Sequence, residues 1–158
     1  MFKRFLSIIL SLFLSACQAV TSTPHKPNKS DSPIQNALDK HLAQWQKADI
    51  HNYSYVFQRS CFCMRDYTKA VLITVDNDVV VDAKFADSKG NLPDQLKINR
   101  QPISYLFDKI QDAIDRKAHS INVKYNEQFG YPTSISIDYD QQIADEELYL
   151  RASDFKAE

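Results

Sequence analysis

The chain has 158 residues, of which 19 are Lys or Arg and 20 are Asp or Glu, giving a formal net charge of −1 at pH 7. This balance argues against a nucleic-acid binder, which would need a basic stripe. The chain has two glycines, Gly90 and Gly130, and their wide separation excludes the glycine-rich loops that bind phosphate groups.

The first 17 residues have the pattern of a lipoprotein signal. Lys3 and Arg4 precede an apolar run between residues 5 and 14; roughly ten residues are too few to span a bilayer but suit a signal peptide. The run ends in Leu14-Ser15-Ala16-Cys17, which resembles a bacterial lipobox. We therefore expect residues 1–16 to be removed and Cys17 to carry acyl chains such as palmitate, which anchor a protein stably when two or more are present. The alternative is an ordinary secretory signal with a chance cysteine at its cleavage site.

A tether is predicted between the lipidated residue and the folded domain. Gln18, rather than Asp, follows Cys17. By resemblance to Gram-negative lipoproteins, this favours the outer membrane, facing the periplasm, over the inner membrane. Residues 17–33 are rich in Pro, Ser and Thr, so we expect a lipidated tether that reaches on the order of 50 Å when extended. Residues 34–158 then suit a single domain with one core.

That domain is predicted to begin with a helix. Ser32 can serve as the N-cap, Pro33 suits the first turn, and Gln35 would complete a capping box. Apolar side chains then recur at helical spacing. They are Ile34, Leu38, Leu42 and Trp45.

Strands and a second helix follow. Alternation of apolar and polar residues predicts half-buried strands, residues 76–78 predict a hairpin turn, and residues 87–101 read as a polar loop. A sheet with one solvated face favours antiparallel pairing with the helices on the other face. We therefore predict an α+β fold, a two-layer antiparallel sheet with two helices packed on one face, in the order α-β-β-β-α-β-β-β. The predicted strands are residues 53–58, 68–75, 79–85, 121–126, 134–139 and 148–152, and the second helix is residues 102–119.

Cys61-Phe62-Cys63 is the first stretch with chemical potential. With Cys17 assigned to lipid, the two remaining thiols would meet in an oxidising compartment, where a disulfide is the simplest outcome. On an extended strand their Cα atoms would lie about 6.6 Å apart, near the upper limit for a bridge, so the backbone must bend. The chain-entropy model gives so short a loop only about 1.6 kcal/mol, so the bridge would shape one turn or be redox-labile. Free thiols, or a soft-metal site with Met64 or His51 as a further donor, are the alternatives.

The second such stretch is Phe129-Gly130-Tyr131-Pro132, a compact turn between two predicted strands. Gly130 can adopt a positive φ, and Pro132 pre-sets the exit from the turn. An aromatic-rich turn of this kind is either a structural device or an exposed binding tip. We treat these four residues as a possible binding turn.

These features together resemble a family of bacterial secreted and lipoprotein domains of uncharacterised function. The resemblance covers nearly everything after the tether, with Asn126 at a position where the family usually has Asp. It implies export and a single fold, and it implies no activity. The motifs that carry it are the Cys61-x-Cys63 pair and the signature Tyr125-x-x-x-Phe129-Gly130-Tyr131-Pro132-x-x-Ile135-x-Ile137-Asp138.

No catalytic motif stands out. The four histidines are scattered, and none shares a motif with a plausible nucleophile, so an enzyme is the less favoured interpretation and we expect no catalytic or metal residues and no cofactor. The leading hypothesis is a lipid-anchored, non-catalytic module of the cell envelope that binds a protein or a small ligand. The alternative is a thiol-redox or soft-metal module using Cys61 and Cys63.

Overall fold

The computed structural model describes residues 32–87, 92–143 and 145–158. It confirms the predicted α+β fold and, apart from two short 3₁₀-helices, the predicted order α-β-β-β-α-β-β-β. The elements are α1 (Pro33–Ala48), β1 (Tyr53–Ser60), η2 (Arg65–Thr68), β2 (Val71–Asp76), β3 (Val79–Phe85), η3 (Asp94–Asn99), α2 (Ile103–Asp115), β4 (Ser120–Tyr125), β5 (Pro132–Asp138) and β6 (Leu148–Ala157).

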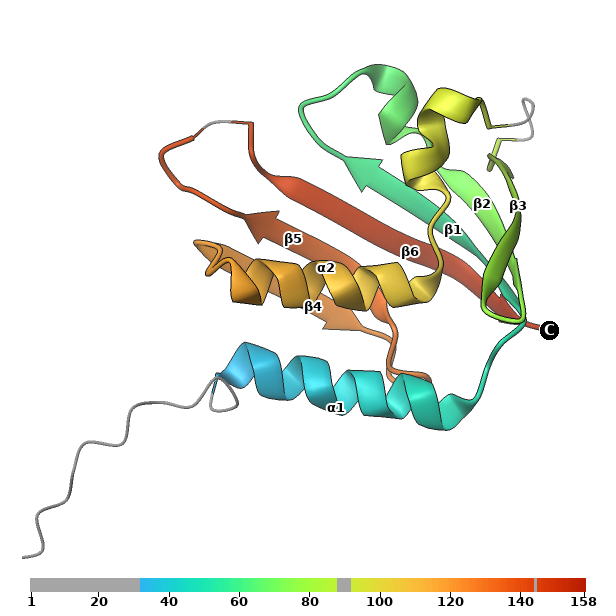
Figure 1. Ribbon diagram of the computed structural model, residues 1–158, viewed down its shortest axis with the longest axis horizontal. Helices are drawn as coiled ribbons and strands as arrows, with labels where there is room; N and C mark the ends of the chain where they lie inside the picture. The colour runs from blue at the N-terminus through green and yellow to red at the C-terminus, as the bar shows by residue number, and fades with distance from the viewer. Residues whose placement is uncertain (1–31, 88–91, 144) are drawn as a thin grey trace, which may run out of the picture.

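The strands form one six-stranded sheet in the order β3-β2-β1-β6-β5-β4. Every neighbouring pair is antiparallel. The first and last strands of the domain are central neighbours, with Tyr53 opposite Ala157 and Ser60 opposite Tyr149. Figure 1 shows both α-helices on the same face of this sheet, running in opposite directions.

The core lies between this sheet face and the helices. Alternate residues of β1, namely Tyr53, Tyr55 and Phe57, are almost fully buried, as expected for a strand with one solvated face. Alternate residues of β2 and β5 are buried in the same way, and α2 contributes one apolar face. These further core residues are Val71, Ile73, Val75, Ile103, Leu106, Phe107, Ile110, Ile135 and Ile137.

Buried tyrosines of β1 also position the start of α2. The Tyr53 hydroxyl accepts a hydrogen bond from the Ile103 backbone N–H at 2.9 Å, which satisfies one of the free donors of a helix N-terminus. The Tyr55 hydroxyl donates to the Gln101 carbonyl just before the helix. Burial raises the pKa of Tyr53 to about 12, so its hydroxyl stays neutral at physiological pH.

The start of α1 differs from the prediction. The Ser32 side chain makes no capping hydrogen bond. Gln35 is instead 7% exposed and points to Asp39 and Gln111. A partner on α2 therefore replaces the predicted capping box. The helix begins at Pro33, the last residue assigned to the tether.

The predicted polar loop 87–101 is also corrected, because it contains η3. Leu96 and Asn99 are buried there, and the Asn99 amide donates to the Tyr67 carbonyl at 3.0 Å. The second predicted strand begins at Val71 rather than at residue 68, because residues up to Thr68 form η2. The two 3₁₀-helices thus close one end of the core.

Two element ends were also misplaced, for identifiable reasons. The helix α2 ends at Asp115 rather than near residue 119. Lys117 has φ 57°, and the Ala118 N–H donates to the Ala113 carbonyl at 2.9 Å, as in a Schellman motif. Ala118 therefore keeps helical spacing although it lies beyond the end of the helix. In β6, Asp154 has φ 52° beside a register shift. This bulge changes the phase of the strand, so Phe155 packs on the core and β6 continues beyond residue 152. Over the described ranges, no helix is long and apolar enough to cross a membrane.

Candidate functional site

A groove between α1 and α2 is the first candidate site. It has a volume of about 300 Å³. Two of its apolar side chains, Leu38 and Phe107, are only 2% and 3% exposed, whereas Gln46, Ser104 and Asp108 are exposed. The lining residues are Leu38, Leu42, Trp45 and Gln46 of α1 and Ser104, Phe107, Asp108 and Gln111 of α2.

Helical spacing brings these side chains to one groove. Leu38, Leu42 and Trp45 follow one face of α1, and Ser104, Phe107 and Gln111 follow one face of α2, because residues three or four positions apart share a helix face. At one end of the groove, the amides of Gln35 and Gln111 bond to each other at 2.9 and 3.1 Å. This reciprocal pair holds the two helices at a fixed separation.

Aromatic packing closes the other end of the groove. Trp45 contacts the rings of Tyr53, Tyr131 and Phe155 edge-on, with centroid distances of 5.6, 5.9 and 5.8 Å. It is the single tryptophan of the chain. The indole is therefore held by the core on one side and lines the groove on the other.

Three polar side chains at the groove have no partner among the described residues, in contrast to Gln111. Within the described ranges, Gln46, Ser104 and Asp108 make no side-chain hydrogen bond or ion pair. A bound molecule with hydrogen-bond donors would find one carboxylate, one hydroxyl and one amide available here. The arrangement combines an apolar wall with a few orienting polar groups, which is typical of small-molecule sites.

The Cys61-x-Cys63 loop is the second candidate. The two sulfur atoms lie 2.09 Å apart, at disulfide-bonding distance, and the Cα atoms lie 5.3 Å apart. The Cys63 N–H donates to the Cys61 carbonyl at 2.8 Å, so the backbone bends at Phe62. Of the described large hydrophobic side chains, Phe62 at 82% and Met64 at 70% are the most exposed.

The possible binding turn is packed against α1. Gly130, Tyr131 and Pro132 are buried, and Phe129 is half-buried. The Gln44 amide of α1 donates to the carbonyls of residues 127 and 128 at 2.7 and 3.2 Å. This burial favours the structural interpretation of the turn over an exposed binding tip.

The packing of Asn126 supports the same conclusion. Its Oδ1 accepts hydrogen bonds from the backbone N–H groups of Gln128 and Phe129 at 3.0 and 2.8 Å. Beside it, Tyr125 stacks on His41 with a centroid distance of 4.0 Å. The signature that the sequence emphasised therefore joins the β4–β5 hairpin to α1.

His51 forms a cluster that the sequence did not reveal. Its Nδ1 lies 2.6 Å from Asp78 Oδ2 and its Nε2 lies 3.1 Å from Asp49 Oδ1. These hydrogen bonds, first that to Asp78, raise the pKa of His51 above 6.5. Because carboxylates occupy both ring nitrogens, neither is available as a base for a nucleophile. The only sequence feature that pointed to this cluster was the predicted turn at residues 76–78, which contains Asp78.

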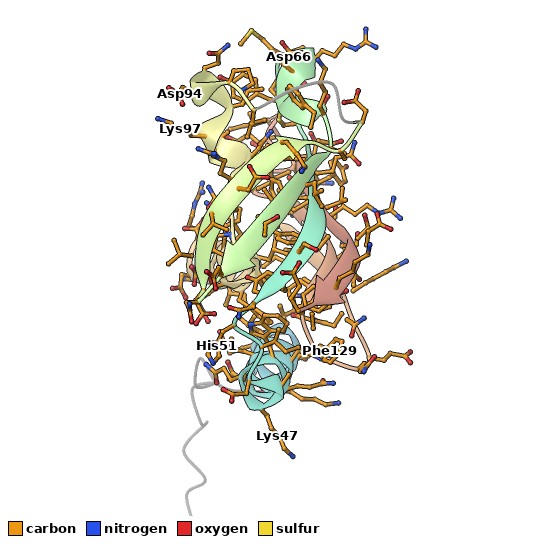
Figure 2. The ribbon with its side chains drawn as sticks, turned by 90° about the vertical axis from the view of Figure 1, so that its right-hand side faces the viewer. Lys47, His51, Asp66, Asp94, Lys97 and Phe129 are labelled. Carbon is orange, nitrogen blue, oxygen red and sulfur yellow. A yellow bond between two sulfur atoms is a disulfide. The ribbon has the colours of Figure 1, made fainter. Side chains whose placement is uncertain are left out.

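The His51 cluster does not lie near the Cys61-x-Cys63 loop. Figure 2 shows His51 and Phe129 at one end and Asp66, which directly follows the Cys61–Arg65 segment in sequence, at the other. His51 therefore does not join the cysteines as a metal ligand, whereas Met64 is adjacent to them in sequence. Among the residues described, no group of three or more His, Cys, Asp or Glu could hold a metal ion.

Cys17, the predicted lipidation site, lies outside the described residues. Comparison with known proteins adds a family assignment. A model described as a family of unknown function (DUF6174) matches residues 37–157. No curated protein and no solved structure matches the chain.

Proposed function

Because the chain belongs to this family of unknown function, we propose from its own residues that it is a lipid-anchored, non-catalytic binding module of the bacterial cell envelope. Acyl chains on Cys17 would hold it at the outer membrane, facing the periplasm. The stretch up to residue 33 would allow the domain to stand clear of the bilayer. The support for this part is the lipobox-like Leu14-Ser15-Ala16-Cys17.

The binding site in this proposal is the groove between α1 and α2, and its occupant is a small molecule. The volume of about 300 Å³ is at the lower end of the ~300–1,000 Å³ range of small-molecule sites. A helix is ~10 Å wide, so a partner helix could place only part of one face in a groove of this volume. A compact organic ligand therefore fits the groove better than a docked helix.

The chemistry of the groove favours a ligand with an apolar body and a cationic group. The observation that carries the proposal is the unpartnered Asp108 carboxylate beside an apolar wall that includes Trp45. A carboxylate strengthens hydrogen bonds from a charged donor, and an indole face attracts cations. Gln46 and Ser104 would accept or donate further hydrogen bonds.

Trp45 provides the readout for a direct test, since it is the only tryptophan and lines the groove. We expect 2-phenylethylamine to change its fluorescence saturably and phenylacetate, the anionic counterpart, to bind more weakly. Asp108→Asn should weaken amine binding by about two- to fivefold, the range of an exposed ion pair. Asp138→Asn is the matched control, because Asp138 lies on β5 in phase with the opposite sheet face.

A blocking variant separates ligand binding from local effects on Trp45. Ser104→Phe adds bulk at an exposed groove position and should abolish the saturable change while thermal unfolding stays cooperative. Equal binding of amine and anion, or equal effects of Asp108→Asn and Asp138→Asn, would contradict the proposed site. Crosslinking of an envelope protein through the groove, without amine binding, would replace the small ligand by a protein partner.

A thiol-redox or soft-metal function at Cys61 and Cys63 is the second candidate, supported by the position of the pair on a loop in which none of residues 61–66 is buried. For the metal form, the reduced cysteines and Met64 would offer three soft sulfur donors. Titration of the reduced protein with copper(I) should then give one tightly bound ion per chain. The Cys61→Ser/Cys63→Ser variant should lose that ion, and retention of it would exclude this site.

A further inference from the structure

We propose that the Cys61–Cys63 disulfide is an exchange site that oxidises pairs of cysteines in extended, apolar polypeptide segments. This inference rests on the redox form of the second candidate function and names its substrate class. It combines three observations on one loop: a disulfide closed over a single residue, an exposed position, and two exposed apolar side chains, Phe62 and Met64.

The loop can open without disturbing the core. None of residues 61–66 is buried, and η2, which follows, also has no buried residue. A bridge that encloses one residue removes little loop-closure entropy from the unfolded chain. Since neither packing nor chain entropy resists reduction strongly, the pair is suited to exchange rather than to global stabilisation.

The exposures of the two cysteines assign the direction of attack. As whole residues, Cys63 is exposed and Cys61 is half-buried, so we assign the attack of an incoming thiolate to the Cys63 sulfur. The bond between the two sulfurs breaks, a mixed disulfide forms at Cys63, and Cys61 leaves as a thiolate that takes up the proton lost by the substrate thiol.

The second step completes the oxidation. The other substrate thiolate attacks the substrate sulfur of the mixed disulfide, which forms the substrate disulfide and releases the Cys63 thiolate. That thiolate takes up the second proton. Two electrons and two protons have passed from the substrate dithiol to the Cys61–Cys63 pair, and one chain oxidises one dithiol.

Phe62 and Met64 indicate that the substrate is an apolar polypeptide. Phe62 lies between the two cysteines and Met64 follows them, so a polypeptide that reaches the sulfurs also meets these side chains. Burial of apolar surface would favour such a segment over a small polar thiol, and a flexible methionine adapts to varied partners. The nearby charges of Asp66 and Lys69 are paired at 2.7 Å, so the exposed Arg65 is the one charged side chain of residues 61–66 outside an ion pair, beside the apolar Phe62 and Met64.

A stoichiometric assay with the purified lipidated protein tests the inference. The probes are a synthetic peptide with two cysteines flanked by Leu and Phe, and a matched peptide with Ser at the flanking positions. We expect one oxidised peptide per chain, with the apolar peptide reacting about tenfold faster if Phe62 becomes substantially buried. A single-cysteine version of the peptide, quenched with acid, should give a mixed disulfide that maps to Cys63.

Variants then identify the contribution of the apolar side chains. Phe62→Ser/Met64→Ser should make the two peptides react at the same rate, with each peptide rate normalised to that variant's own rate of exchange with glutathione. Val81→Ser is the control, because Val81 is also exposed, at 57%, but lies on the edge strand β3. It should preserve the preference for the apolar peptide.

The outcomes separate the inference from the function on which it rests. If neither glutathione nor a peptide reduces the pair, both the redox candidate and the inference are overturned. If the pair exchanges with glutathione but the two peptides react equally fast, redox function stands and the polypeptide substrate is rejected. Attachment of the single-cysteine peptide at Cys61 would overturn the assigned direction of attack.

Discussion

Gly130 lies so close to α1 that a Cβ atom on it would be 2.6 Å from the carbonyl oxygen of His41. The same atom would be 2.9 Å from the Cβ of Gln44. The backbone of the β4–β5 turn thus touches the backbone of the first helix with no space for a side chain. This contact gives the glycine of the family-like signature a physical role in folding.

Gly130→Ala should therefore destabilise the domain strongly. The substitution combines a residue with φ +82°, unfavourable by about 1–2 kcal/mol for a side-chain-bearing residue, with overpacking worth about 1–3 kcal/mol. We expect a loss of about 2–5 kcal/mol in the free energy of unfolding, measured by urea denaturation. Gln128→Ala in the same turn is the control, and an equal effect there would contradict the steric explanation.

Asn126 should tolerate Asp but not Ala. Its Oδ1 accepts two backbone hydrogen bonds within the turn, and a carboxylate oxygen can accept both equally well. Asn126→Ala should lower the free energy of unfolding by about 1–3 kcal/mol, since each such bond contributes about 0.5–1.5 kcal/mol. Asn126→Asp should remain close to wild type, because its carboxylate keeps both acceptor interactions.

Residue periodicity predicted the fold well because each half-buried element has a clear signal of its own. Tyr53, Tyr55 and Phe57 alternate with polar or solvent-facing neighbours, and one sheet face is indeed buried. Strand order carries no such local signal. The pairing of β1 with β6 joins residues about a hundred positions apart, and only packing of the whole domain determines it.

The groove was not predictable for the same reason. Leu42 and Trp45 were correctly predicted to lie on an apolar helix face. Part of that face lines a groove instead of being fully covered by other side chains. The separation of the helices depends on the reciprocal bonds of Gln35 and Gln111, 76 positions apart. By contrast, the close approach of Cys61 and Cys63 was readable, since two positions of separation leave little freedom.

His51 should make stability depend on pH in a defined direction. Its pKa is raised above 6.5 by the hydrogen bond to Asp78, then by that to Asp49. A raised folded-state pKa means that the stabilisation is present below about pH 6.5 and is lost as pH rises through the folded value. Urea midpoints of wild type and His51→Gln should therefore converge above that value.

NMR titration of the His51 ring would measure the same shift directly. The midpoint should lie above 6.5, and Asp78→Asn should lower it more than Asp49→Asn, because Asp78 is the larger contributor. Equal effects of the two variants would contradict the assigned ranking of the two carboxylates.

Reduction of the Cys61–Cys63 pair should change global stability only slightly. In protein isolated from cells, the peptide that contains both cysteines should have a mass two hydrogens lower than its reduced form. A mild reductant, or the Cys61→Ser/Cys63→Ser variant, should lower the free energy of unfolding by about 1–2 kcal/mol. A much larger loss would show that the loop supports the core, in conflict with its exposed residues.

The lipid anchor is tested by Cys17→Ser. If the lipobox-like stretch is read by the lipoprotein pathway, wild-type protein will sediment with membranes and its N-terminal peptide will carry the mass of acyl chains. The variant should stay unprocessed or appear in the soluble fraction, because no cysteine is left at the cleavage site to receive lipid. Cys61→Ser/Cys63→Ser should still sediment, since each buried methylene of the anchor contributes about 0.8 kcal/mol independently of the domain. A soluble wild-type chain that begins at an unmodified residue would instead support the ordinary secretory signal, and the domain would then act as a free periplasmic or secreted protein.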